Sequence, residues 1–150
     1  IAIETPYFLP TENLNNALIT AALAGVKVEL MIPDRTDSRL TTYAANSYLA
    51  QLLEAGVEVY RYQAGFLHSK LLLIDERIAS IGSANMDFRS LEHNFEIAGI
   101  LYDEGMTRRL RQIFEEDKRS CLRLEAESWA QRGWRGRFAE SFMRLFAPLL

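Results

Sequence analysis

The sequence predicts an α/β fold: a mixed, mostly parallel β-sheet flanked by helices, followed by a C-terminal helical tail. Strand-like and helix-like patterns alternate through residue 62, which favours parallel strands joined by helical crossovers. Beyond that point two apolar stretches, 67–74 and 78–82, are separated by only three residues. Three residues are too few for a crossover helix, so these stretches should pair as an antiparallel hairpin. Crossovers followed by a hairpin make the sheet mixed.

The first 62 residues contain the crossover part of the sheet. The expected elements are a strand at 1–4, a helix after Thr11, a strand at 26–32, a helix at 40–55 and a strand at 57–62. Thr11 is a good N-cap, and apolar residues recur behind it at helical spacing until Gly25 ends the helix. Pro33 closes the second strand, and Gly56 ends the second helix. The two helices can therefore cover the strands that they join.

The remaining residues complete the sheet and add the tail. After the hairpin, an apolar stretch at 95–102 predicts another strand, and a helix at 104–119 follows with Asp103 as its cap. We divide the chain into a folded unit at residues 1–119 and a basic amphipathic helical segment at residues 120–150.

Composition limits the kind of protein. A chain of 150 residues can form one domain with a real core, burying roughly 70% of its unfolded surface. No stretch approaches the roughly 20 apolar residues of a membrane span. The first residue is Ile1 and not Met, so we expect a C-terminal piece of a longer protein, with any targeting signal or anchor upstream. One cysteine excludes an internal disulfide framework, and two histidines disfavour a zinc site, so we expect no metal or other cofactor.

Charge is unevenly distributed. Residues 1–118 carry 11 basic and 17 acidic side chains, a net charge of −6, whereas residues 119–150 carry six Arg and three Glu, a net charge of +3. An acidic body disfavours nucleic acid as a partner, because binding it requires Lys and Arg to neutralise phosphates.

The tail interleaves aromatic and basic residues, a pattern suited to a surface of anionic lipid. The residues concerned are Trp129, Trp134, Phe138, Phe142, Leu145 and Phe146 with Arg132, Arg135, Arg137 and Arg144. Amphipathic helices more often bury their apolar side in protein, so a helix packed on the domain is an equally good reading.

The hairpin carries the residues that point to chemistry. His68 and Lys70 are two apart on a predicted strand and should share a face, and the hairpin can return Ser83 and Asn85 beside them. Imidazole can act as nucleophile or proton carrier, and the other three groups can donate to an oxyanion. A phosphodiester fits this set, with Lys and Asn in the place of a cation. The His-x-Lys pair alone is a weak signal, because such pairs often lie on solvated strands.

The joint spacing of these residues is a far more specific signal than the His-x-Lys pair alone. The pattern H-x-K-x4-D, six further residues and G-S-x-N resembles the signature of the phospholipase D superfamily. Its members here are His68, Lys70, Asp75, Gly82, Ser83 and Asn85. The resemblance extends through "ETPYFLP", "GVKVELMIP", "LLEAGVEVY", "NFEIAGILYD" and "RLFAPLL", and these stretches look like the second catalytic half of bacterial cardiolipin synthases. Residues 1–119 would then be a phospholipase D-like catalytic half, present in one copy.

The resemblance implies a role for each matched residue. His68 would attack phosphorus to form a phosphohistidine, or protonate the departing alkoxide. Lys70 and Asn85, with Ser83, would hold the phosphoryl oxygens, and Glu96 would orient the imidazole. Asp75 belongs to the catalytic signature, although a place in the hairpin turn favours a supporting role.

The implied activity is a phosphatidyltransferase that moves a phosphatidyl group between phosphatidylglycerol molecules and releases glycerol at the bacterial cell membrane. A single copy supplies one imidazole, so the site needs a second phospholipase D-like half, in the same chain or from a homodimer partner. Alternatives are a phosphodiester hydrolase or nuclease that uses water as acceptor, and a lipid-binding half without turnover. The acidic body disfavours the nuclease.

Overall fold

The computed structural model describes residues 1–36 and 38–133, and six positions beyond them: 136, 138, 140, 142, 143 and 145. Of Arg39 it describes the backbone alone. Five of the residues on which the predicted lipid contact of the tail depends lie outside the described residues: Trp134, Arg135, Arg137, Arg144 and Phe146.

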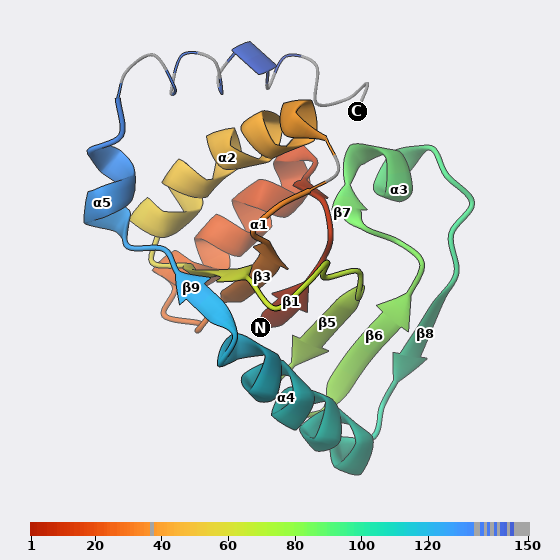
Figure 1. Ribbon diagram of the computed structural model, residues 1–150. Helices are drawn as coiled ribbons and strands as arrows, with labels where there is room; N and C mark the ends of the chain where they lie inside the picture. The colour runs from red at the N-terminus through yellow and green to blue at the C-terminus, as the bar shows by residue number, and fades with distance from the viewer. Residues whose placement is uncertain are drawn as a thin grey trace.

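A seven-stranded mixed sheet forms the centre of the molecule, in the order β8-β6-β5-β1-β3-β4-β9 (Figure 1). Its strands are β1 (Ala2–Glu4), β3 (Glu29–Pro33), β4 (Glu58–Tyr62), β5 (Leu71–Ile74), β6 (Ile78–Gly82), β8 (Ala98–Leu101) and β9 (Cys121–Arg123). A second, two-stranded parallel sheet pairs β2 (Phe8–Leu9) with β7 (Met86–Asp87).

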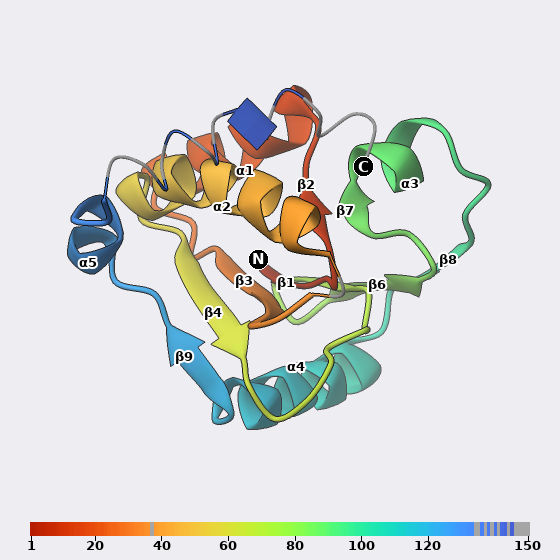
Figure 2. The same ribbon diagram turned by 45° about the horizontal axis from the view of Figure 1, so that its top comes forward.

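Helices cover both faces of the large sheet. They are α1 (Glu12–Leu23), α2 (Arg39–Glu54), α3 (Phe88–Glu92), α4 (Glu104–Lys118) and α5 (Ala126–Ala130). Figure 2 shows α1 and α2 above the sheet and α4 below it. The predicted caps are confirmed at two helices, because Thr11 accepts a hydrogen bond from the Leu14 N–H and Asp103 accepts one from the Met106 N–H.

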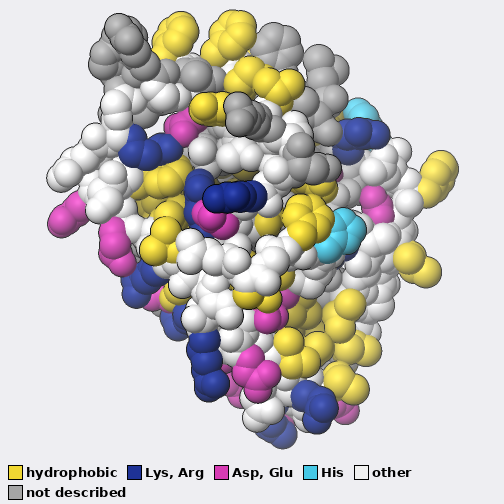
Figure 3. Space-filling model, in the orientation of Figure 1, with side chains coloured by type: hydrophobic (Ala, Val, Ile, Leu, Met, Phe, Trp, Pro, Cys, Tyr) yellow, Lys and Arg dark blue, Asp and Glu magenta, His cyan; other side chains and the backbone are white. Residues whose placement is uncertain are grey.

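Strand alternation divides the apolar residues into two cores. Ile3, Leu30 and Val59 point toward α1 and α2, where they join a large cluster. Their neighbours along the strands point the other way, and Met31 and Tyr60 pack there around the fully buried Phe114 of α4. The sheet is thus buried on both faces where the helices lie. Apolar side chains still reach the surface over β5, β6 and β8, at the lower right of Figure 3.

The predicted mixed α/β sheet is confirmed, but less of it is parallel than expected. Within the large sheet only β1–β3 and β3–β4 pair in parallel, and the other four described pairs are antiparallel. After β4 the chain returns through a loop and places β5 antiparallel to β1. Helix α4 later connects β8 at one edge of the sheet to β9 at the other edge, where β9 pairs antiparallel with β4.

Two predicted strands begin later than expected. The stretch 67–70 lies outside the sheet, so β5 starts at Leu71, and β8 starts at Ala98 instead of residue 95. The predicted boundary at residue 119 also separates segments that share one sheet, because β9 pairs with β4. Trp129 of α5 is 9% exposed and belongs to the α1/α2 core. None of the helices in the described part is long and apolar enough to cross a membrane.

Candidate active site

His68 and Lys70 lie side by side in the segment that leads into β5. The Lys70 Nζ donates to the His68 backbone carbonyl at 2.9 Å and lies 3.3 Å from Nδ1 and 3.4 Å from Nε2 of the imidazole. The two residues therefore point the same way, as predicted, although they precede the strand. The similar distances mean that the amine is not aligned with one ring nitrogen alone.

Two carboxylates act on the charge of Lys70 at longer range. Partial burial lowers the pKa of Lys70, and the negative charges of Glu96 and Asp87 act against that shift. Both carboxylates belong to the chain that follows β6. The amine of Lys70 is therefore affected electrostatically by the segment that also contains Ser83 and Asn85.

A buried carboxyl group lies behind the pair. Ser69, between His68 and Lys70, donates a hydrogen bond from its hydroxyl to Oε2 of Glu4 on β1. Glu4 is only 2% exposed, and burial raises the pKa of its carboxyl group. This contact joins the central strand of the sheet to the segment that presents the imidazole and the amine.

Ser83 and Glu96 are held together at the exit of β6. The Ser83 hydroxyl donates to Glu96, and the Asn94 amide donates to the same carboxylate at 3.2 Å. These hydrogen bonds, that of Ser83 first, lower the pKa of Glu96. The Ser83 N–H also donates to the Ile97 carbonyl at 2.9 Å. Glu96 thus contacts Ser83 and Asn94, whereas the family resemblance implied a contact with the imidazole of His68.

Asn85 lies two residues beyond Ser83 and lines a hollow together with Lys70. Its Nδ2 donates to Asp87 at 3.0 Å, and Asp87 in turn caps α3 by accepting from the Ser90 N–H at 2.7 Å. The Asn85 Oδ1 is buried with no hydrogen-bond partner among the described residues. Asn85 and Lys70 together line a cavity of about 150 Å³. The structure therefore brings the amide and the amine to one hollow.

Asp75 does not join this group. It follows the last residue of β5, whereas Lys70 precedes the first, so the two residues are five steps apart along the strand, or about 16 Å at 3.3 Å per residue. Asp75 and Glu76 adopt positive φ angles of 50° and 53° in the tight turn to β6. Asp tolerates this conformation better than most residues, which explains its place in the turn.

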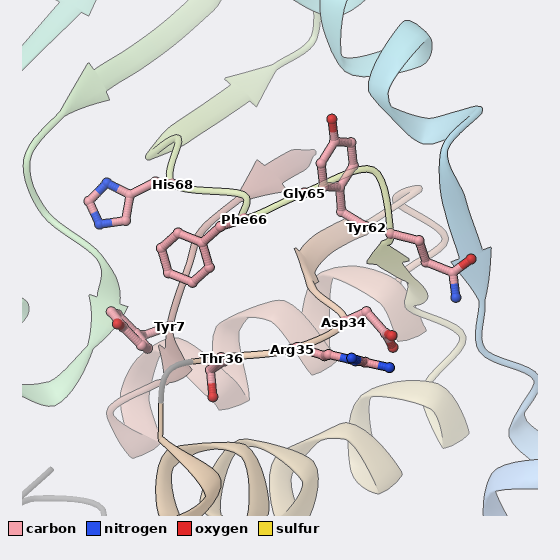
Figure 4. A pocket seen from close by; sticks show the side chains of 9 residues that line it. Tyr7, Asp34, Arg35, Thr36, Tyr62, Gly65, Phe66 and His68 are labelled. Carbon is pink, nitrogen blue, oxygen red and sulfur yellow. The ribbon is translucent and has the colours of Figure 1, made fainter.

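His68 does not line the hollow of Asn85 and Lys70 and instead borders a different, large open cavity of about 830 Å³ (Figure 4). The cavity lies where β1, β3 and β4 end, and its lining residues are Tyr7, Asp34, Arg35, Thr36, Tyr62, Gln63, Gly65, Phe66 and His68. The Phe66 ring stacks on the imidazole, with centroids 5.6 Å apart and planes inclined by 29°. Ligands commonly bind beyond the carboxyl ends of parallel strands. That rule could have pointed to these residues from the sequence.

The chemistry of the site suits an anionic, tetrahedral group. Lys70 supplies a cation beside the imidazole, Asn85 an amide, and Arg35 a second cation across the larger cavity. Within residues 1–36, 38–133 and the described tail positions, no three His, Cys, Asp or Glu side chains gather in a way that could hold a metal ion. The charge on a bound phosphate would be met here by nitrogen donors.

Comparison with known proteins identifies the family of the chain. Residues 1–118 match the family described as "Cardiolipin synthase, PLD-like domain". The cardiolipin synthase of Geobacillus kaustophilus is 46% identical over 150 residues, which are all of this chain and 30% of that protein. Cardiolipin synthase 1 of Staphylococcus epidermidis is also 46% identical over 150 residues, 31% of its length. The chain thus spans about a third of the length of these relatives.

Two solved structures share the fold. Nuc from Salmonella typhimurium, a phospholipase D family member, has a TM-score of 0.71 and 18% identity over 82% of this chain and 80% of its own. The phosphatidylserine synthase of Haemophilus influenzae has a TM-score of 0.72 and 18% identity over 99% of this chain and 39% of its own. The family match covers most of the sequence, and we conclude that the chain belongs to the cardiolipin synthase PLD-like domain family.

Proposed function

We propose that this chain is one catalytic half of a phosphatidyltransferase that makes cardiolipin from two molecules of phosphatidylglycerol. The observation that carries the proposal is the position of Lys70, whose amine lies 3.3 Å and 3.4 Å from the two ring nitrogens of His68. A cation at this place favours an anionic phosphodiester beside the nucleophile. The family to which the chain belongs supports the same substrate class.

The reaction would proceed by two displacements at phosphorus. A ring nitrogen of His68, or of its counterpart in the other half, attacks the phosphodiester of the first lipid and forms a P–N bond. The P–O bond to glycerol breaks, and glycerol leaves with a proton from the second imidazole. The terminal hydroxyl of the second phosphatidylglycerol then attacks phosphorus, gives its proton to that imidazole, and breaks the P–N bond. The products are cardiolipin and glycerol.

Lys70 and Asn85 would stabilise the phosphoryl oxygens as negative charge builds in each transition state. Ser83 and Glu96 have a different role in this proposal. Because Ser83 donates to Glu96, the pair would fix the loop that carries Asn85, and Glu96 would keep Lys70 protonated through its charge. Asp75 would act only by shaping the turn between β5 and β6.

A second phospholipase D-like half is required, since the described residues place one imidazole, that of His68, beside a lysine. The two cardiolipin synthases named above are about three times as long as this chain, which leaves room for such a half in the same polypeptide. We also propose that the enzyme works at the surface of the cell membrane. The exposed Phe138 and Leu145 of the tail support this placement.

The test uses the full-length protein and vesicles of phosphatidylglycerol. We expect the parent to form cardiolipin and glycerol, and His68→Ala and Lys70→Ala to lose at least about a hundredfold of this rate. His93→Ala is the matched control, since His93 is the other histidine of the chain and packs on Phe88 of α3. Equal rates in all four proteins would refute the assignment. Phosphatidic acid as the main product would show that water is the acceptor, and a phospholipase D-type phosphodiester hydrolase would replace the synthase.

A further inference from the structure

The cavity beside His68 has room for more of a substrate than the reacting phosphate. Its volume of about 830 Å³ is within the roughly 300–1,000 Å³ usual for sites that bind small organic ligands. Its walls combine aromatic rings with polar side chains. The rings are those of Tyr7, Tyr62 and Phe66, and the polar groups include those of Asp34, Thr36 and Gln63. Such walls suit a ligand with both polar and apolar parts.

The proposed reaction brings two phosphates to this site. The phosphate of the donor lipid reacts at His68, whereas the phosphate of the acceptor phosphatidylglycerol keeps all its bonds. The carbon chain of glycerol separates that second phosphate from the hydroxyl group that attacks. A side chain that binds the second phosphate must therefore lie away from the imidazole, on another wall of the site.

Arg35 has this position. Figure 4 shows Asp34, Arg35 and Thr36 along one wall of the cavity, in the chain between β3 and α2, and Phe66 and His68 along the opposite wall. Arg35 is exposed, and its guanidinium makes no ion pair or hydrogen bond with another side chain in the described part of the molecule. A guanidinium has five N–H donors in a fork that matches the oxygens of a phosphate group.

The neighbouring carboxylate of Asp34 does not cancel the charge of Arg35, because Arg61 pairs with it. The Arg61 Nη1 lies 3.8 Å from the Asp34 Oδ1, and its Nη2 donates to the Asn46 Oδ1 at 2.6 Å. One carboxylate and two guanidiniums leave a net charge of +1 here, in a chain whose formal net charge is −3. A local positive excess attracts an anion and disfavours an ammonium headgroup.

We propose that Arg35 binds the phosphate of the acceptor phosphatidylglycerol, which keeps its bonds in the reaction. This inference rests on the proposed function, because it assigns the second lipid of that reaction to the wall opposite His68. Gln63 and Thr36 line the same cavity and can donate hydrogen bonds to the phosphate or to the glycerol hydroxyl groups. Water carries no phosphate, so the contact with Arg35 favours transfer to lipid over hydrolysis.

The test measures how the full-length protein divides the phosphatidyl group between two soluble acceptors. Vesicles of phosphatidylglycerol are the donor, and labelled glycerol 3-phosphate and labelled glycerol are added together at equal concentrations. In each case an acceptor oxygen forms the new P–O bond as the P–N bond breaks, and its proton passes to the second imidazole. Both acceptors compete for one intermediate, so the ratio of the two labelled products is independent of the amount of active enzyme.

We expect Arg35→Ala to lower the ratio of the glycerol 3-phosphate product to the glycerol product at least about tenfold, because charge-assisted hydrogen bonds to the phosphate are lost. Arg35→Lys keeps the charge without the fork and should lower the ratio only about threefold. Arg77→Ala is the matched control and should keep the parental ratio. Its side chain is 75% exposed in the turn between β5 and β6.

Two results would overturn the proposal. One is an unchanged ratio in Arg35→Ala, and it includes the case in which both products fall equally, because Arg35 would then act on vesicle binding and not on the acceptor. The other is an equal fall of the ratio in Arg77→Ala, which would show a general effect of charge. If the parent makes phosphatidic acid instead of cardiolipin from lipid alone, the proposed function fails, while the ratio of soluble products still tests Arg35. A parent that makes cardiolipin, with an unchanged ratio in Arg35→Ala, rejects the inference alone.

Discussion

Ser69 and Glu4 are 65 residues apart in sequence and form a hydrogen bond in which the Ser69 hydroxyl donates to the buried carboxyl group. Ser69 lies between the two residues of the candidate site, so this contact fixes the segment from behind while His68 and Lys70 face outward. The other oxygen of Glu4, Oε1, is buried with no hydrogen-bond partner in the described part of the chain. Burial raises the pKa of this carboxyl group, which favours its neutral form.

Glu4 should therefore position the site without touching substrate. We expect Glu4→Ala to lower kcat about 10- to 100-fold, because small displacements of reacting groups have effects of that size. Glu4→Gln should retain most of the activity, since its amide oxygen can accept from Ser69 and the side chain is neutral. KM for phosphatidylglycerol should change little in either variant. A loss of activity in Glu4→Gln as large as in Glu4→Ala would show that the carboxyl group itself is needed.

Gly82, the first residue of the G-S-x-N motif, has a packing reason to be glycine. A Cβ on Gly82 would lie 2.2 Å from the Ile97 carbonyl oxygen and 2.7 Å from the Ala98 Cα, both of them backbone atoms. Gly82→Ala must push β8 away from β6, which should lower the free energy of unfolding by about 2 kcal/mol and displace Ser83. Urea unfolding and the transferase rate measure the two effects.

Gly99 on β8 provides the matched control. A Cβ there would lie 3.8 Å from the Ile81 carbonyl oxygen, an ordinary contact. The free energy of unfolding of Gly99→Ala should therefore lie within about 0.5 kcal/mol of that of the parent, and the variant should keep its activity. Similar losses in the two variants would mean that glycine is needed at both positions for a reason other than this close approach.

The sequence predicted the groups that carry chemistry better than the contacts that hold them. The spacing of His68 and Lys70 is local, and two residues in an extended segment share a side whether or not the segment joins a sheet. The hairpin 71–82 was equally readable, because only three residues join its strands. Both features depend on neighbours in sequence, so no knowledge of distant contacts was required.

Contacts between distant residues could not be read in this way. Nothing local to Glu4 indicates that it meets Ser69, and the carboxylate of Glu96 meets Ser83 where the resemblance implied an imidazole. The sheet also contains less parallel pairing than the early crossovers suggested, because the direction of β5 and β9 is set by long-range pairing. Trp129 looked like a lipid-facing residue, yet it is buried against α2.

Glu29 should make the stability of the domain depend on pH. It is 1% exposed and accepts hydrogen bonds from Lys118 and Arg111 of α4, with Lys27 at 3.0 Å. Burial alone would raise the pKa of Glu29, but the hydrogen bonds of Lys118, Arg111 and Lys27 outweigh it and lower the pKa to about 2. Between that value and the ordinary 4.5, the folded protein binds fewer protons at this residue than the unfolded chain, so stability rises with pH.

We expect acidification from pH 6 to pH 3 to remove about 2 kcal/mol of this contribution. Glu29→Gln should be less stable than the parent at pH 6 and should lose less on acidification, as measured by urea unfolding at both pH values. Glu54→Gln is the control, because Glu54 is exposed at the end of α2. If Glu29→Gln and the parent lose the same stability between pH 6 and pH 3, the α4 ion pairs do not hold the carboxylate in its charged form.

The described positions of the tail include one buried acidic side chain and exposed apolar ones. Positions 136, 138, 140, 142 and 143 are helical. Glu140 is 5% exposed and accepts from Arg132 at 2.6 Å, so this side packs on the domain. Phe138 and Leu145 are 69% and 73% exposed. The tail thus packs on the protein through Glu140 and leaves these two apolar side chains at the surface.

The double variant Phe138→Ser/Leu145→Ser should bind vesicles of phosphatidylglycerol about tenfold or more weakly than the parent, because a buried Phe or Leu contributes about 1.5–3 kcal/mol. Vesicle flotation of the full-length protein measures this change. Leu23→Ser controls for the loss of an exposed apolar side chain elsewhere, since Leu23 is 71% exposed on α1. Unchanged flotation of the double variant would leave Phe138 and Leu145 without a role in membrane binding. A loss of vesicle binding equal to that of Leu23→Ser would indicate an effect of general surface hydrophobicity instead of a specific contact made by the tail.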